Sequence, residues 1–166
     1  AGLEAALEYA KTRKQFGSPV ANFQGIQWLL AQMAMEIAAA RGLVHRAALL
    51  LDNDKPATEA SSMAKCYASD MAVRQTAEAV QIFGGSGYIK GYEVERLNRD
   101  AQITQIYEGT NQIQRTIIAR QLLKKGNGCF VHASLRSKFY PRDIEYMPVV
   151  KLLARLDLET KSLVSS

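Results

Sequence analysis

The sequence is poor in the residues that build disulfide and metal sites. It has two cysteines and two histidines among 166 residues. Cys66 and Cys129 form no framework, and neither His45 nor His132 has a second His or Cys nearby at ligand spacing. We therefore expect no disulfide and no metal site, and we expect Cys66, in a stretch rich in Ala and Met, to be a small buried apolar residue.

Long hydrophobic runs, a signal peptide and an initiating methionine are also missing. No apolar run approaches the roughly 20 residues of a membrane span. The first ten residues, Ala1 to Ala10, already have the pattern of the middle of a helix. We therefore expect a piece cut from a larger protein, with no membrane as partner.

Charge is not concentrated in any part of the chain. The formal net charge is +5, and the basic residues are scattered without aromatic residues between them. This pattern argues against nucleic acid as a partner. A mild positive charge would favour a ligand that carries phosphate, although more often such a balance has no functional meaning. The hydrophobic content of 48% is ordinary for a globular chain of one domain.

Alternation of period two is absent from residues 1–125, whereas helical periodicity recurs throughout them. The expected helices are 1–15, 23–52, 57–83, 92–103 and 111–124. Gly17-Ser18-Pro19 is expected to end the first helix, and Gly84 to Gly87 the third. Long helices with short connections predict an all-α protein with an antiparallel helix bundle over residues 1–125. Residues 126–166 form an unassigned tail with one possible helix after Pro148.

The apolar positions in these helices predict which faces are buried. On 23–52 the stripe is Ile26, Leu30, Met33, Ile37, Ala40, Val44, Ala47 and Leu51. On the last helix Ile113, Ile117 and Leu122 are expected to face the core. Glu95 and Arg99 are spaced for an i,i+4 ion pair. Asp70 is expected either to be paired in the interior or to face solvent.

One carboxylate stands beside a glycine just ahead of the last helix. The ring of Tyr107 can shield Glu108 from water and favour the neutral carboxyl. Gly109 permits a close approach of the backbone to a ligand, or a positive φ. Glu108 is thus a candidate base, and the alternative, favoured by these residues alone, is a solvated glutamate in a loop that enters a helix.

The helix that follows begins with residues suited to capping. Thr110 or Asn111 is a good N-cap, and Gln114, three residues after Asn111, gives a start like a capping box. The N–H groups at such a helix start attract an anion or a polarised carbonyl. A candidate oxyanion or phosphate site therefore follows directly after the candidate base.

The segment Y-E-G-T-N-Q-I-Q-R, residues 107–115, resembles the catalytic segment of acyl-CoA dehydrogenases, flavoenzymes that desaturate acyl-CoA thioesters. Four more segments, in the same order and spacing, are similar to motifs of this family: R-K-Q-F-G at 13–17, F-Q at 23–24, Q-I-F-G-G-S-G-Y at 81–88 and V-E-R-L-N-R-D at 94–100. The resemblance covers residues 1–125. It implies the all-α C-terminal domain of the family, truncated at its N-terminus and without the N-terminal helical and middle β domains.

The resemblance implies a base at Glu108 that takes the α-proton of the thioester, while a flavin accepts the β-hydrogen as hydride. The backbone N–H of Glu108 would help to bind the thioester carbonyl, and Gly109 would leave room for the substrate. Some family members place the base on an earlier helix, so Glu108 favours the short- and medium-chain arrangement. One departure from the family is Glu93, where proline is usual, and it leaves the start of that helix open.

The resemblance also implies FAD as cofactor, bound by two sets of residues. Thr110, Asn111 and Gln112 would lie against the flavin of their own subunit. The second set would reach the FAD held mainly by a neighbouring subunit, and it comprises Arg13, Lys14, Gln15, Phe23, Gln24, Gln81, Ile82, Phe83, Gly84 and Gly85.

These assignments have physical reasons and structural alternatives. Arg13 can pair with a pyrophosphate, or it can be a solvated cation at a helix end. Gly84 and Gly85 can bring N–H groups close to a phosphate, or they can only stop a helix. Phe23 can offer a face to a ring, or it can belong to the core.

The partners expected from the resemblance are an acyl-CoA substrate, an electron-transfer flavoprotein as electron acceptor, and further copies in a homodimer or homotetramer. The compartment would be the cytoplasm in a bacterium and the mitochondrial matrix in a eukaryote. The chain alone is expected to be inactive. The alternative function is a non-catalytic helical module for oligomerisation or scaffolding, which the presence of Glu108 disfavours.

Overall fold

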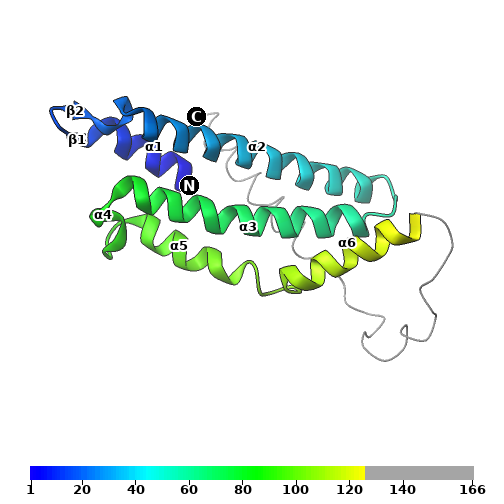
Figure 1. Cartoon of the computed structure of the whole chain (residues 1–166). Coiled ribbons are helices and arrows are strands. Elements are labelled where there is room, and N and C mark those ends of the chain that lie inside the picture. Colours follow the sequence, from blue (N-terminus) through cyan, green and yellow to red (C-terminus); the bar gives the residue numbers. More distant parts are fainter. Residues whose placement is uncertain (126–166) are drawn as a thin grey trace. The chain divides into compact units, whose positions relative to one another are not determined.

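The structure, a computed structural model, describes residues 1–125 and is almost entirely helical (Figure 1). The elements in order are α1 (Gly2–Thr12), β1 (Lys14–Gln15), β2 (Ser18–Pro19), η1 (Val20–Asn22), α2 (Gln24–Asp52), α3 (Thr58–Phe83), α4 (Gly85–Tyr88), α5 (Glu93–Ile103) and α6 (Asn111–Lys125). The prediction of an all-α protein is confirmed. The helix expected in the tail 126–166 lies outside the described residues.

The two long helices, α2 and α3, form an antiparallel hairpin. Near the start of α2, Met33 shares a core cluster with Ala79 near the end of α3. Near the end of α2, Ala47 shares a second cluster with Ala60 and Ala64 near the start of α3. Positions that rise along α2 therefore meet positions that fall along α3, as the short connection between the helices requires.

The chain divides into two compact units, and both long helices contribute to each of them. The first unit comprises residues Ala1–Gly42 and Cys66–Thr110, and the second comprises Leu43–Lys65 and the chain from Asn111 onward. The core of the first unit is centred on Ala6, Met33, Ala79 and Val94, which are fully buried. The second unit has a core of small residues, with Leu43, Val44 and Leu50 packed around it.

The first helix ends earlier than the sequence predicts. It stops at Thr12 instead of about residue 15, and Arg13 is extended, with φ −69° and ψ 126°. A short antiparallel hairpin follows, in which Lys14 pairs with Pro19 and Gln15 with Ser18. Two-residue strands are too short to show alternation, so the sequence pattern misses them.

The glycine run after α3 does more than stop that helix. Gly84 has φ +61°, and the single turn α4 follows it. A Cβ at Gly87 would lie 2.7 Å from both the Val80 carbonyl oxygen and the Phe83 Cβ. Gly87 therefore lets α4 approach the backbone of α3 as closely as it does.

Helix α5 begins at Glu93, where the sequence left the start open. Glu93 is thus the first helical residue, a position that proline and acidic residues both suit. Its carboxylate pairs with Arg96 at 3.1 Å. The predicted pair of Glu95 and Arg99 is confirmed, with an N–O distance of 3.6 Å.

The predicted buried faces are correct for most of α2 and wrong in part for α6. Met33, Ala40 and Ala47 are buried on α2, whereas Leu51 is 36% exposed. Leu122 was expected to face the core but is 51% exposed. Two polar residues take the buried positions of α6 instead, and they are Asn111 and Gln114.

Two further expectations can be checked in the described part of the chain. Cys66 is 7% exposed, so the prediction of a buried cysteine is confirmed. Asp70 is half-buried and accepts a hydrogen bond from Gln105, which decides between the two alternatives in favour of a paired residue.

Among residues 1–125, no helix is both long and apolar enough to cross a membrane.

Candidate functional site

The carboxylate of Glu108 lies on a short segment between α5 and α6. After Ile103 the chain continues in turns, with the Thr104 N–H donating to the Ala101 carbonyl at 3.1 Å and the Tyr107 N–H to Ile103 at 3.1 Å. The backbone then enters the left-handed region at two successive residues, with φ +53° at Glu108 and +86° at Gly109. The positive φ predicted as one use of Gly109 is confirmed, whereas the sequence did not indicate it for Glu108.

Neither Tyr107 nor Glu108 is shielded from water within the described residues. Tyr107 is 40% exposed, and Glu108 is also exposed. The expectation that the ring of Tyr107 protects the carboxylate is therefore wrong for this chain. A phenol ring that is itself in solvent removes little water from its neighbour. Exclusion of water from Glu108 would have to come from a ligand or from other segments.

The start of α6 is held by a buried hydrogen bond. Helix α6 begins at Asn111, which leaves Thr110 at the N-cap position. Asn111 is 3% exposed, and its Oδ1 accepts a hydrogen bond from Lys65 Nζ at 2.7 Å. Its side chain is thus directed to the protein interior. Thr110 is half-buried and Gln112 is exposed, so these two present more surface to a ligand.

The second set of predicted FAD-binding residues, those expected to reach the cofactor of a neighbouring subunit, begins at the β1–β2 hairpin. Arg13, Lys14 and Gln15 are all exposed. The Arg13 carbonyl accepts a hydrogen bond from the Val20 N–H at 2.8 Å, which ties the hairpin to η1. Two cations and an amide on one exposed hairpin are suited to a phosphate-bearing ligand.

Phe23 and Gln24 follow η1, at the start of α2. Gln24 is exposed, whereas Phe23 is half-buried and packs against the core of the first unit. Its ring also meets that of Phe16 edge to face, with the centroids 6.3 Å apart. Phe23 therefore has a structural role, and part of its surface remains accessible.

The end of α3 divides into buried and exposed residues. Ile82 and Phe83 are 6% and 9% exposed, and the Phe83 ring stacks on Tyr9 with a centroid distance of 4.0 Å. Their side chains belong to the core, so a cofactor could reach only their backbone. Gln81, Gly84 and Gly85 are exposed and remain available.

The structure brings the second set together and separates it from Glu108. The residues of the hairpin, of the start of α2 and of the end of α3 gather around one core, which contains Val20, Ile82 and Phe83. Glu108 belongs to the same unit but follows the far end of α5. Eleven helical residues span about 16 Å. The two places are therefore distinct sites on one chain.

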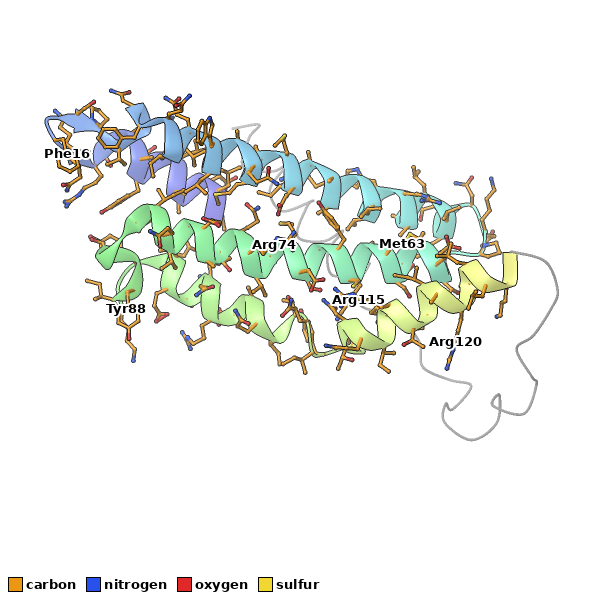
Figure 2. The ribbon with its side chains drawn as sticks, viewed as in Figure 1. Phe16, Met63, Arg74, Tyr88, Arg115 and Arg120 are labelled. Carbon is orange, nitrogen blue, oxygen red and sulfur yellow. The ribbon has the colours of Figure 1, made fainter. Side chains whose placement is uncertain are left out.

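Phe16, at the tip of the hairpin, was not among the predicted site residues, although it lies beside them (Figure 2). It is 96% exposed and has φ +51°, an unusual conformation for a bulky side chain. With Gly17 at φ +78° it forms a two-residue turn of the kind usually built from Asn-Gly. The signal was present in the motif R-K-Q-F-G, where an aromatic residue precedes the glycine of a tight turn.

No group of three or more His, Cys, Asp or Glu residues within 1–125 is arranged to hold a metal ion. The chemistry that these residues can offer is that of one carboxylate on a left-handed turn and, separately, of a cationic hairpin with an exposed aromatic ring.

Comparison with known proteins adds a family match and close relatives. The family described as acyl-CoA dehydrogenase, C-terminal domain, matches residues 1–123. A probable acyl-CoA dehydrogenase of Bacillus subtilis, YngJ, is 56% identical over 124 residues, which are 75% of this chain and 33% of that protein. The caffeyl-CoA reductase–Etf complex subunit CarC of Acetobacterium woodii is 53% identical over 123 residues, or 74% of this chain and 32% of that protein.

A solved structure with a similar fold is that of butyryl-CoA dehydrogenase from Megasphaera elsdenii. It matches with a TM-score of 0.73 and 52% sequence identity, over 74% of this chain and 32% of that chain. The chain thus spans about one third of the length of the relatives that it matches.

Proposed function

The chain belongs to the acyl-CoA dehydrogenase family, as the C-terminal domain of that family, and from this premise we propose that the whole protein is an FAD-dependent acyl-CoA dehydrogenase. It would form a double bond between the α and β carbons of an acyl-CoA thioester. The observation that carries the proposal is Glu108, held with Gly109 in a left-handed turn directly ahead of α6. A carboxylate on such a turn is of the residue type that can take up an α-proton.

In the proposed reaction the Glu108 carboxylate takes the α-proton of the thioester. A carbon acid is weak, so the base must be aimed at the proton and the developing enolate oxygen must be hydrogen-bonded. The N–H of Glu108 is proposed as one donor to that oxygen. Gly109, without a side chain, leaves space for the acyl group beside the base.

The residues present fit FAD by the chemistry of their donors. Arg13 and Lys14 are exposed cations for a pyrophosphate, and Gln15, Gln24 and Gln81 are exposed amides. Phe16 offers an exposed ring face beside them. When bound, FAD supplies the acceptor for the β-hydrogen, and the protein supplies binding and orientation.

The separation of the two sites supports an assembly of several copies. Thr110 and Gln112 follow Glu108 in the sequence, after the C-terminal end of α5. The cationic hairpin leads into η1, whose Val20 shares a core cluster with Val94 at the start of α5. We propose that one chain serves its own flavin with the first group and a neighbour's flavin with the second, in a homodimer or homotetramer. An electron-transfer flavoprotein is proposed as the electron acceptor, since the similar protein CarC is named as a subunit of an Etf complex.

The test is Glu108→Gln in the full-length protein, assayed with a short acyl-CoA and a dye acceptor. Removal of the base should lower kcat about 10²–10⁴-fold. The flavin absorbance should be unchanged, because the amide has the shape of the carboxylate. Glu8→Gln, at an exposed position of α1, is the matched control and should retain full activity. Full activity of Glu108→Gln would move the base elsewhere and refute the assignment.

A further inference from the structure

The glycine turn between α3 and α4 is held by two backbone hydrogen bonds, and both end on Gly84. The Gly84 N–H donates to the Gln81 carbonyl at 3.1 Å, and the Gly84 carbonyl accepts from the Gly87 N–H at 2.9 Å. Gly84 has φ +61° and ψ −141°, a conformation that glycine adopts freely and other residues avoid. The turn and the end of α3 both lie in the first unit.

The hydrogen bond from Gly87 sets the direction of the peptide group that joins Gly84 to Gly85. This peptide is trans, so its carbonyl and its N–H point in opposite directions. The Gly84 carbonyl is directed to the N–H of Gly87 in α4, and the Gly85 N–H is therefore directed away from α4. Gly84 and Gly85 are exposed, whereas Gly87 is buried. The turn thus offers a backbone donor at the surface.

Close contact with α3 fixes the place of Gly87. A Cβ at this position would lie 2.7 Å from both the Val80 carbonyl oxygen and the Phe83 Cβ, and 3.0 Å from the Val80 Cα. None of these atoms is the far end of a flexible side chain. Phe83 is also held by Tyr9, on which its ring stacks. Only glycine can therefore bring the N–H of residue 87 so close to α3.

We propose that Gly87 is a positioning residue for the cofactor. Its fit against α3 holds the peptide of Gly84 and Gly85 in the orientation in which the Gly85 N–H can donate to a phosphate oxygen of FAD. Backbone N–H groups held in advance are a common means of binding phosphate. Gly87 is buried and would act through this peptide without touching FAD. The proposal rests on the function proposed above, in which Gly84 and Gly85 reach the cofactor.

The first experiment measures the Kd of FAD for the full-length apoprotein, from the change in flavin fluorescence on binding. In Gly87→Ala the added methyl group should push α4 from α3 and turn the peptide. Loss of one hydrogen bond to a charged group should raise the Kd about 10–100-fold. Ala6→Gly is the control for lost stability, because Ala6 is buried on α1 in the same core and glycine weakens a helix. Its Kd should be that of the wild type.

The second experiment is a double-mutant cycle with Gly84→Ala. A Cβ at Gly84 meets nothing within 4 Å, so this change acts through the backbone conformation alone. It should raise the Kd by a factor similar to that of Gly87→Ala. Because both changes disturb one peptide group, the double variant should bind FAD about as well as the weaker single variant. Losses that multiply in full would overturn the route through the shared peptide.

Amide hydrogen exchange of the apoprotein tests the contact between α4 and α3 without any cofactor. In Gly87→Ala, exchange within residues 84–92 should accelerate about tenfold, while α1 stays protected and shows that the variant is folded. Unchanged exchange of this segment would overturn the close fit, and a Kd equal to that of the wild type would overturn its role in FAD binding. Failure of the proposed function has a different signature, since the wild-type apoprotein itself would then not bind FAD.

Discussion

At the scale of single residues, a few positions adopt a backbone conformation that is unfavourable for residues other than glycine. Three non-glycine residues have positive φ, namely Phe16, Asp54 and Glu108. Aspartate adopts this conformation readily, and Asp54 lies in the turn between α2 and α3. Phe16 and Glu108 have no such preference, and each lies in one of the two candidate sites. Strain of this kind is typical of functional positions.

Replacement of Phe16 by asparagine separates strain from function. Asparagine tolerates the left-handed conformation and gives the Asn-Gly turn that hairpins favour, so Phe16→Asn should stabilise the protein by about 1 kcal/mol. Little packing is lost, because the ring is 96% exposed. Removal of the ring should weaken retention of the flavin. Thermal unfolding of the apoprotein and the flavin content after dialysis are the two measurements, and unchanged flavin content would contradict a role for the ring.

At the scale of elements, the contacts between helices depend on individual small and polar residues. Gly87 permits the approach of α4 to α3, and Glu36 on α2 meets two side chains of α3. Glu36 Oε2 accepts hydrogen bonds from Gln75 at 2.9 Å and from Arg74 at 3.1 Å, and the labelled Arg74 can be followed in Figure 2. These contacts align the helices that carry the sites.

Substitution of Gly87 by alanine should destabilise the protein by about 1–3 kcal/mol. The added methyl group would overlap the Val80 carbonyl oxygen at 2.7 Å, and this backbone atom cannot move without a shift of α3 or α4. Gly42→Ala is the control, since a Cβ there meets nothing within 4 Å and α2 is continuous. It should be neutral or stabilising by up to about 1 kcal/mol. Urea denaturation measures both, and equal stability of the two variants would refute the close contact.

Acidification should weaken the contact of Glu36 between α2 and α3. The hydrogen bond from Gln32 on its own helix lowers the pKa of Glu36 most, burial opposes this, and Gln75 and Arg74 add to the lowering. Because the pKa is lower in the folded state, this stabilisation is complete above the ordinary glutamate pKa of about 4.3. It is lost as the pH falls through the lower pKa of the folded protein.

Glu36→Gln is accordingly expected to cost about 1–2 kcal/mol at pH 7 and less near pH 3. Denaturation curves of the two proteins at several pH values give the difference directly. Glu8→Gln, at an exposed position of α1, is the matched control for the loss of one carboxylate. A difference for Glu36→Gln that stays constant from pH 7 to pH 3 would contradict the argument.

At the scale of the whole molecule, the described chain presents much apolar surface. Trp28, Met35 and Leu49 on α2 are 60% exposed or more, and Ile106 next to the Glu108 segment is 60% exposed. Large apolar side chains in such numbers indicate surfaces that other segments or other copies cover. This agrees with a chain that spans about one third of its relatives' length.

The isolated 166-residue chain is therefore expected not to turn over an acyl-CoA. Glu108 is exposed here, and a base for a carbon acid must work in a site from which water is excluded. A dye-reduction assay with a short acyl-CoA and added FAD should show no rate above background. The full-length protein under the same conditions is the positive control, and a comparable rate from the isolated chain would show that one third of the protein suffices.

The helices and the motifs could be predicted from the sequence because both depend on residues that are close together along the chain. The 3.6-residue period along 23–52 requires no knowledge of any partner, and the bounds of α2 and α3 agree with the prediction within one residue. The Glu108–Gly109 pair and the hairpin cations were likewise visible as neighbours in the chain.

Close contacts, buried polar pairs and the exposure of single side chains could be decided only by the tertiary structure. The approach of Gly87 to Val80, the hydrogen bond of Lys65 to Asn111 and the exposure of Leu122 have no signature in periodicity. Each depends on which surface lies opposite, and that is set by packing and not by the local pattern. Strain at Phe16 and Glu108 belongs to the same class, because intrinsic preference alone would place both residues at negative φ.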